Sequence, residues 1–441
     1  MAIGTDIGLA LASEVGDVSQ LQTASKQLVG ALNEVLSGAG GGDKQSSFII
    51  APSNAVNKDK ADLVLTGTND VQAINLALDT LRGIGTQAIR VDFLGGDIII
   101  DDKIVIPNNC KVYGNGCVLN QVSFTGKNMT GKTMIMSGIT GISIEGFTFN
   151  LSQSVDTNGG SGEGINLVSG KVLNCTIGNI FNRNGISMVA GDVSNCIFGN
   201  ISTSGKGVYL GSGRVTGCTF GNISGYPACY GIHMYGNTGT KISISACTFG
   251  NISESSSAGI YVNTGTIPMV ITVSDCVVGN VTNYAYGINV SSGAQGSEHC
   301  ACIVSRCNVG NVSATGFGIC VSSSVYNRNT EVSACTIYDV TNSARGIYVP
   351  YGRVIDCIIP SVSNYGIGIH STVGTVSDCY IKSVASSAYG IKMDGSYPNL
   401  GLVINNKLDE LIMGSGTYIF VGSSVTEKNN LKEGSWTNYG A

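Results

Sequence analysis

Residues 196–223 read CIFGNISTSGKGVYLGSGRVTGCTFGNI, a stretch that begins and ends on the same motif. A second motif, Gly-[Ile/Val]-x-[Met/Val/Leu/Ile], lies between the two copies, as GVYL at Gly207. A third short segment with alternating apolar residues precedes each cysteine. Self-similarity of this kind indicates a repeat architecture. The motif, Cys-x-[Ile/Phe/Val]-Gly-Asn-[Ile/Val], occurs at Cys175, Cys196, Cys218, Cys247, Cys276 and Cys307.

Less regular copies continue the repeat on both sides, and successive copies lie 21 to 31 residues apart. Each repeat holds three short segments in which apolar residues alternate, and a period of two is typical of strands. Three strands in so short a unit leave no room for crossover helices. We therefore predict an all-β fold, a right-handed parallel β-helix with three strands per coil and about 12 coils. The less regular copies begin at Cys117, Gly146, Cys335, Cys357, Cys379 and Asn406.

The repeated positions predict columns of equivalent side chains along the β-helix. The cysteines are expected to point inward as small apolar residues, and the alternative, metal ligation, lacks the usual C-x₂-C spacing. The Gly-Asn pair is expected to form a bend with left-handed backbone, which glycine and asparagine tolerate best. Its asparagines would bond from side chain to backbone between coils; the alternative is a ligand-binding column. They are Asn179, Asn200, Asn222, Asn251, Asn280 and Asn311.

The composition excludes several classes of protein. Charged residues make up only 12% of the 441 residues while apolar residues make up 43%, so general disorder is excluded. The 62 glycines follow no three-residue period, which excludes collagen. A net charge of −5 argues against nucleic-acid partners, and no apolar stretch is long enough to predict membrane insertion. Fifteen cysteines, mostly at one repeated position, predict packed thiols in a reducing compartment, and the first residues do not predict a secretory signal.

Residues 67–81, GTNDVQAINLALDTL, predict one amphipathic helix capped by Asn69 or Asp70. Strands are expected directly after it, at 89–94, 97–101 and 103–106. An open end of a β-helix must be covered to prevent aggregation, so this helix is expected to cover the first coil.

The same region carries a family resemblance. The pattern G-x-x-D-x-x-A-I-x-x-A-L from Gly67, followed by IPNNCKVYGNGCVL at 106–119, resembles the entry region of the pectate-lyase-like superfamily, which also occurs in many phage tailspikes. With the coils, the resemblance covers about residues 61–411. It implies a right-handed parallel β-helix, but not one activity, because lyases, hydrolases and non-catalytic adhesins share this fold.

Residues 18–36, VSQLQTASKQLVGALNEVL, resemble a short segment that recurs in phage fibre and other virion proteins. Leu21, Leu28 and Val35 fall on the a and d positions of a heptad, together with two alanines. So short a coiled coil needs partner chains or a socket, which predicts a homotrimer and attachment to a virion protein through residues 1–40. The alternative is an ordinary helix packed on its own chain.

The predicted domain organisation has five parts. They are a helical anchor at 1–36, a linker at 37–60, an N-terminal cap at 61–110, the β-helix at 111–411, and a C-terminal cap or tail at 412–441.

The repeat also predicts one candidate binding surface. The extra residues of four consecutive repeats fall at one place, in loops 234–241, 263–270, 291–302 and 322–331, and such insertions often mark the binding face of a solenoid. Beside them lies the outward position of the Gly-Ile strand, where rings and amides suit a sugar. The alternative is that tyrosine is simply favoured in exposed strands. The column consists of Asn166, Ser187, Tyr209, His233, Tyr261, Asn289, Cys320 and Tyr348. The predicted glycan-binding residues are Tyr209, His233, Tyr261, Asn289 and Tyr348 from this column, together with Tyr235, Tyr326 and Arg328 from the loops.

Three carboxylates are candidate catalytic residues. Asp356 and Asp378 occupy one slot in adjacent coils, which would bring two carboxylates together as glycoside hydrolases require. The alternative is a solvated turn, because other residue types fill the same slot elsewhere. Glu298 is a further candidate, and neither a metal nor a cofactor is expected.

The sequence therefore predicts a phage or prophage fibre or tailspike-like protein, located in the virion and binding a bacterial surface polysaccharide. Two alternatives stay open: a polysaccharide depolymerase on the same β-helix, and a decoration fibre of the head without a ligand of its own. The low content of charged residues favours binding over catalysis.

Overall fold

The computed structural model describes most of the chain from residue 47 onward. The predicted anchor with Leu21, Leu28 and Val35 lies outside these residues. The chain divides into unit 1, Met1–Gly178, and unit 2, Asn179–Ala441. The described residues are 47–68, 70–82, 89–121, 135–137, 140–151, 163–236, 241–264, 269–292, 301–323, 329–385, 387–394, 401–411, 417–421, 425–428 and 430–432.

Unit 1 contains the predicted helix, α3 (Asp70–Arg82). Its apolar face is buried through Val71, Ile74 and Leu78. The amide of Asn75 donates to the carbonyl of Lys103 and accepts from the N–H of Val105, so it joins α3 to the following strands. At the start of α3, Oδ1 of Asp70 accepts a hydrogen bond from the Gly67 N–H, while residue 69 lies outside the described residues. The helix is thus confirmed.

The strands of unit 1 pair in parallel, as predicted. The first of them, β1, lies within the range 37–60 predicted as a linker; Phe48 and Ile50 are buried, so ordered structure begins earlier than expected. A short 3₁₀ helix, Lys58–Lys60, follows it. One sheet contains β1 (Ser47–Ala51), β2 (Leu63–Val64), β3 (Ile89–Phe93), β5 (Ile104–Val105), β6 (Cys110–Tyr113), β8 (Ile135–Ser137), β9 (Ile142–Glu145) and β11 (Ile165–Leu173), and the other β4 (Gly96–Ile100), β7 (Cys117–Gln121), β10 (Thr148–Asn150) and β12 (Thr176–Ile177).

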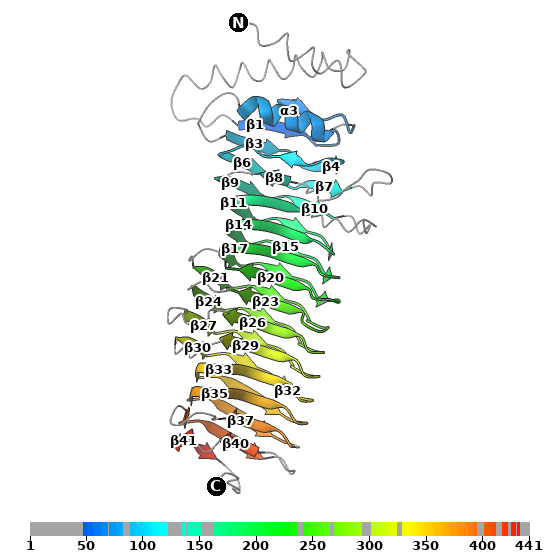
Figure 1. Ribbon diagram of the computed structural model, residues 1–441. Coiled ribbons are helices and arrows are strands. Elements are labelled where there is room, and N and C mark those ends of the chain that lie inside the picture. The colour runs from blue at the N-terminus through cyan, green and yellow to red at the C-terminus, as the bar shows by residue number, and fades with distance from the viewer. Residues whose placement is uncertain are drawn as a thin grey trace. The chain divides into compact units, whose positions relative to one another are not determined.

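Unit 2 is a stack of parallel coils, so the predicted right-handed parallel β-helix is confirmed (Figure 1). The strands of unit 2 belong to three sheets. The long sheet contains β14 (Asn184–Ser194), β17 (Lys206–Thr216), β20 (Tyr230–Tyr235), β21 (Ile242–Ser245), β23 (Ala258–Asn263), β24 (Val270–Ser274), β26 (Tyr286–Ser292), β27 (Ala301–Ser305), β29 (Phe317–Ser323), β30 (Thr330–Ser333), β33 (Arg345–Ile355), β35 (Ile367–Ser377), β37 (Tyr389–Met393), β38 (Gly401–Ile404), β40 (Thr417–Val421) and β41 (Val425–Lys428).

The two other sheets of unit 2 are formed by short strands. The second sheet contains β15 (Ile197–Phe198), β18 (Thr219–Phe220), β22 (Thr248–Phe249), β25 (Val277–Val278), β28 (Asn308–Val309), β31 (Thr336–Ile337), β34 (Ile358–Val362), β36 (Tyr380–Val384), β39 (Lys407–Leu411) and β42 (Leu431–Lys432). The third consists of β13 (Ile180–Phe181), β16 (Ile201–Ser202) and β19 (Ile223–Ser224), and isolated parallel bridges continue it to β32 (Asp339–Val340).

The predicted insertions interrupt the long sheet. Where the repeat is short, one strand of 11 residues crosses the whole sheet, as β17 and β33 do. In the four coils with extra residues two shorter strands replace it, and their ends coincide with the predicted loops. The loops themselves lie mostly outside the described residues.

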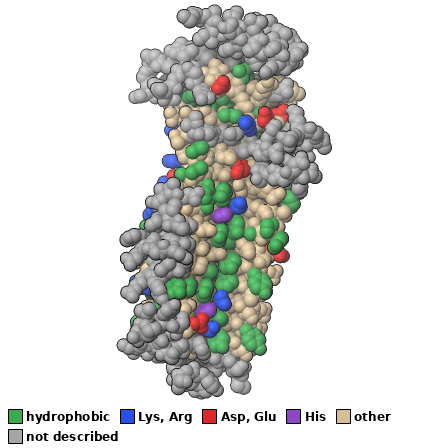
Figure 2. Space-filling model, in the orientation of Figure 1, with side chains coloured by type: hydrophobic (Ala, Val, Ile, Leu, Met, Phe, Trp, Pro, Cys, Tyr) green, Lys and Arg blue, Asp and Glu red, His purple; other side chains and the backbone are tan. Residues whose placement is uncertain are grey.

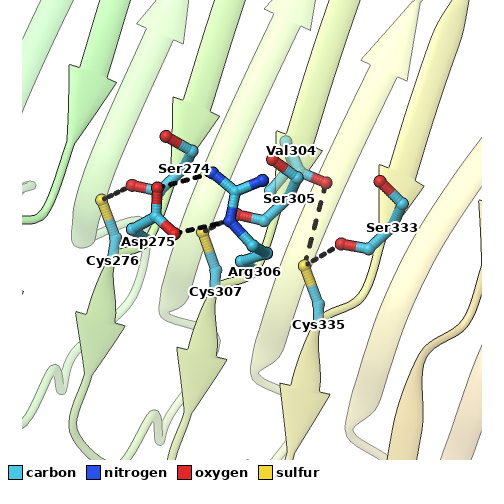
Figure 3. A network of polar contacts seen from close by, with 9 residues as sticks. All are labelled: Ser274, Asp275, Cys276, Val304, Ser305, Arg306, Cys307, Ser333 and Cys335. Carbon is cyan, nitrogen blue, oxygen red and sulfur yellow. Dashed lines mark hydrogen bonds and ion pairs between the residues drawn. The ribbon is translucent and has the colours of Figure 1, made fainter.

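The core consists of columns of apolar side chains, some of them identical from coil to coil. The repeated cysteines are buried thiols, and each thiol donates to the carbonyl two residues earlier, as Cys276 does to Ser274 at 3.3 Å (Figure 3). Phe198, Phe220 and Phe249 stack with ring centroids 4.5 and 4.8 Å apart. The inward cysteine column is therefore confirmed, and the described residues contain no group of three or more His, Cys, Asp or Glu able to hold a metal.

The asparagine column is also confirmed as a structural ladder. The backbone N–H of each asparagine donates to Oδ1 of the asparagine one coil earlier, at 2.9 to 3.0 Å. The glycine before it leaves room for that amide, since a Cβ on Gly250 would lie 2.6 Å from Oδ1 of Asn222.

The expected left-handed backbone at the Gly-Asn pair is wrong. The left-handed residues lie at two other corners: directly before each cysteine, as at Asn195 (φ 53°), and in the turn before each Gly-Ile strand, as at Asn283 and Tyr284. Glycine is therefore used at the Gly-Asn bend for close approach between coils, not for its backbone freedom.

The coils continue beyond the predicted end at residue 411. The strands β40, β41 and β42 pair with β37, β38 and β39. Asn406 and Asn430 occupy the cysteine position here, and Oδ1 of Asn430 accepts a hydrogen bond from the backbone N–H of Asn406 at 3.0 Å. Trp436 lies outside the described residues. No helix within the described residues is long and apolar enough to cross a membrane.

Candidate functional site

The predicted column of outward residues is in register in the structure. Tyr209 pairs with His233, His233 with Tyr261, and Tyr261 with Asn289. Their neighbours Val208 and Leu210 are fully buried, so this column faces outward. The same register continues through Cys320, Tyr348, His370 and Lys392, but Cys320 and His370 are buried rather than exposed. We call the outward side chains of β17, β20, β23, β26, β29 and β33 the aromatic face. Figure 2 shows hydrophobic side chains gathered there, with histidine and cationic side chains among them.

Five rings pack together at one end of the aromatic face. Tyr209 stacks on Tyr235 with ring centroids 4.4 Å apart, and Tyr230 stacks on Tyr261 at 4.9 Å. His233 lies between the two pairs, 5.1 Å from Tyr209 and 5.0 Å from Tyr261. All five side chains are half-buried. Because the rings hold one another, a ligand meets a surface whose side chains are already ordered.

His233 is uncharged in this setting. Burial, and then the nearby ammonium of Lys206, lower the pKa of His233 to about 4. The Lys206 ammonium itself lies 4.7 Å from the ring centroid of Tyr209. The Nδ1 atom of His233 is buried and has no hydrogen-bond partner within the described structure. The ring therefore contributes a flat surface at neutral pH rather than a charge.

A second group of rings follows further along the aromatic face. Tyr286 stacks on Phe317 with ring centroids 5.0 Å apart, and Tyr348 lies 5.1 Å from the ring of His370. The guanidinium of Arg345 lies 5.1 Å from the ring centroids of both Phe317 and Tyr348. Only Tyr348 of this group was in the predicted set. The missed residues share a signal, since Tyr230, Tyr286, Phe317 and Arg345 each directly precede the repeated glycine.

His370, the last ring of this group, belongs to a small polar network. Its Nε2 lies 2.7 Å from Oδ2 of Asp394, and Oδ1 of the same carboxylate lies 3.1 Å from the ammonium of Lys392. Burial lowers the pKa of His370 although Asp394 opposes this effect. For Asp394, burial raises the pKa, but the contacts with His370 and Lys392 outweigh it, so the pKa is lowered. Asp394 is thus an ionised carboxylate with two partners.

The predicted carboxylate pair lies at a different place. Asp356 and Asp378 are exposed, directly before their cysteines, and both have left-handed backbone (φ 53° and 58°). Aspartate tolerates this conformation, which gives both residues a structural reason to be there. In the same slot Asp275 and Arg306 of adjacent coils form an ion pair at 2.7 Å, which lowers the pKa of Asp275 (Figure 3). The geometry favours the turn alternative over catalysis.

Several predicted residues lie outside the described residues. They are Glu298, Tyr326 and Arg328.

Comparisons with known proteins give low similarities. No family model and no curated protein matches the sequence. Among solved structures, the surface adhesin PfbA of Streptococcus pneumoniae is 13% identical with a TM-score of 0.35, and the match covers 83% of this chain and 92% of that one. The A-module of the Azotobacter vinelandii mannuronan C-5 epimerase AlgE6 is 11% identical with a TM-score of 0.36, and the match covers 87% and 98%. The catalytic domain of a GH87 α-1,3-glucanase is 13% identical with a TM-score of 0.43, covering 81% and 66%. At these identities and TM-scores the matches carry no conclusion about this chain.

Proposed function

We propose that the chain is a fibre or tailspike-like subunit of a phage or prophage virion that binds a bacterial surface glycan through the aromatic face. The observation that carries the binding part is the packed ring cluster of Tyr209, Tyr230, His233, Tyr235 and Tyr261. Sugar rings present apolar C–H faces that pack on aromatic rings, while phenol groups donate to and accept from hydroxyls. Rings that are already ordered lose little conformational entropy when a ligand binds.

The virion part of the proposal depends on the sequence of residues 18–36. In this proposal the segment forms a homotrimer and attaches to a virion protein, with Leu21, Leu28 and Val35 at the helix interface. Sedimentation of the full chain tests it: a mass near 45.4 kDa, that of one chain, contradicts the trimer. A trimer that becomes a monomer on deletion of residues 1–40 supports it.

Glycan binding is tested with the full chain and a panel of bacterial capsular and O-antigen polysaccharides. The triple variant Tyr209→Ala, Tyr261→Ala, Tyr348→Ala is expected to lose binding. A matched control removes three tyrosines that are 61 to 77% exposed elsewhere, Tyr226, Tyr284 and Tyr365. Unchanged binding by the first variant, or equal loss in both, refutes the role of the aromatic face.

A polysaccharide depolymerase is the second candidate, and the pairing of His370 with Asp394 beside Tyr348 favours it. A histidine oriented by a carboxylate is a common acid–base arrangement. New reducing ends or unsaturated uronates after incubation with polysaccharide would support it. Loss of that turnover in Asp394→Asn, Asp356→Asn or Glu298→Gln would identify the carboxylate, and absence of turnover leaves binding as the function.

A further inference from the structure

Arg345 is held on the aromatic face by rings on two sides. Its guanidinium carbon lies 5.1 Å from the ring centroid of Phe317, one coil earlier, and 5.1 Å from that of Tyr348 on its own strand. A guanidinium stacks on aromatic rings while its N–H groups, which lie in its plane, stay available to an acceptor. The side chain is half-buried, so this position is preset before any ligand arrives.

Four other arginines of the described residues form ion pairs with carboxylates. Arg90 pairs with Asp92 at 2.7 Å, Arg214 with Asp192 at 3.0 Å, Arg306 with Asp275 at 2.7 Å and Arg353 with Glu331 at 3.6 Å. Within the described structure no carboxylate pairs with Arg345. The chain has few charged residues and a net charge of −5. Arg345 differs from those four arginines because its guanidinium contacts aromatic rings instead of a carboxylate.

The charged side chains described near Arg345 do not neutralise its positive charge. Asp394 is already engaged by His370 at 2.7 Å and by Lys392 at 3.1 Å, so that aspartate and that lysine balance each other. His370 is buried, and its lowered pKa keeps it neutral at pH 7. Among the described residues, the net result around Tyr348 is one positive charge, that of Arg345, with no carboxylate paired to it on an aromatic surface.

We infer that Arg345 binds an acidic group of the polysaccharide, a carboxylate or a phosphodiester, between Phe317 and Tyr348. The inference rests on the proposed glycan binding and specifies which glycans are bound. Guanidinium groups bind both anions with two parallel hydrogen bonds, and a partly buried position strengthens such bonds relative to water. The neighbouring rings supply the apolar contact for the adjoining sugar or polyol.

The test compares the full chain with Arg345→Gln, Arg345→Lys and Arg353→Gln. The control Arg353 lies on the same strand, β33, but is paired with Glu331. The probes are a polyuronate, its uncharged methyl ester and poly(ribitol phosphate), with binding measured at low salt and at 0.3 M salt. We expect one acidic polymer to bind at least about tenfold more tightly than the methyl ester, and less tightly at high salt.

The variants should separate the contributions of charge and geometry. Arg345→Gln should lose the preference for the acidic polymer, Arg345→Lys should retain only part of it, and Arg353→Gln should keep it. Unaltered circular dichroism and melting temperature would show that the variants are folded. A preference for the polyuronate identifies a carboxylate ligand, and a preference for poly(ribitol phosphate) a phosphodiester.

Two results overturn the inference in distinguishable ways. If the methyl ester binds as tightly as both acidic polymers, or if Arg345→Gln binds like the wild type, Arg345 does not recognise an anion, although glycan binding itself stands. If none of these polymers and none of the capsular and O-antigen polysaccharides binds, the proposed function fails together with the inference.

Discussion

The backbone N–H of Asn222 donates a hydrogen bond of 2.9 Å to Oδ1 of Asn200, the residue at the same position one coil earlier. The same bond recurs from Asn179 to Asn311. Each amide thus satisfies a backbone donor at a bend where sheet pairing is interrupted, and an unpaired donor would cost stability. The ladder fixes the register of neighbouring coils independently of the apolar core.

Replacing Asn222 with alanine should destabilise the protein. The change leaves the N–H of Asn251 without its acceptor, and because Asn222 is exposed, water replaces part of the lost bond. We expect the free energy of unfolding to fall by about 1 kcal/mol, measured by urea denaturation. The control Asn308→Ala, at an exposed position outside the ladder, should change it by less than about 0.5 kcal/mol. Equal effects of both changes would argue against the ladder.

Gly250→Ala should be more harmful than its small size suggests. The added Cβ would lie 2.6 Å from Oδ1 and 2.9 Å from the backbone nitrogen of Asn222, so the two coils must separate. We expect a loss of about 1–3 kcal/mol in the free energy of unfolding, as for other overpacked sites. Gly95→Ala is the control, since the nearest atom to its Cβ would be the carbonyl oxygen of Asn115, at 3.4 Å. A Gly250→Ala protein as stable as the control would contradict this account of the glycine.

Protonation of His233 should weaken the fold at acidic pH. Its folded pKa of about 4 lies below the ordinary value of 6.5, so the unfolded chain binds more protons between these values. The stability from this group is present above pH 6.5 and declines as the pH falls toward 4. NMR titration of the His233 ring should give a midpoint near pH 4, and His233→Phe should reduce the decline. A midpoint near 6.5 would refute the burial argument.

The cysteines should be unreactive in the folded protein. Fourteen of the 15 cysteines are buried thiols, and the fifteenth, Cys300, lies outside the described residues. Burial raises the pKa of Cys320 to about 12, so its thiolate is scarce at neutral pH. Titration with a thiol reagent should therefore detect at most one thiol per native chain and all 15 after unfolding in denaturant. Rapid reaction of several thiols in the native state would contradict the inward column.

The spacing of the repeated motifs is enough to predict the stacked coils, the inward cysteines and the asparagine ladder. In a parallel, in-register stack, equal positions of the repeat must lie above one another, so spacing along the chain is enough to predict that Tyr209, His233 and Tyr261 form one column. The motif is lost near the C-terminus, so its spacing does not predict the last coil. The strands β40 to β42 extend the stack past the predicted end at residue 411.

The conformation of the corners and the contacts of the side chains there depend on packing in three dimensions. The left-handed residues lie before the cysteines and not at the Gly-Asn pair, because dihedral angles at a corner depend on how consecutive sheets meet, which the repeat does not encode. Whether Arg345 meets a carboxylate or a ring depends likewise on side-chain rotamers across coils. Spacing along the chain predicts which residues share a column, whereas burial, charge pairing and ring contacts arise only when neighbouring columns pack in three dimensions.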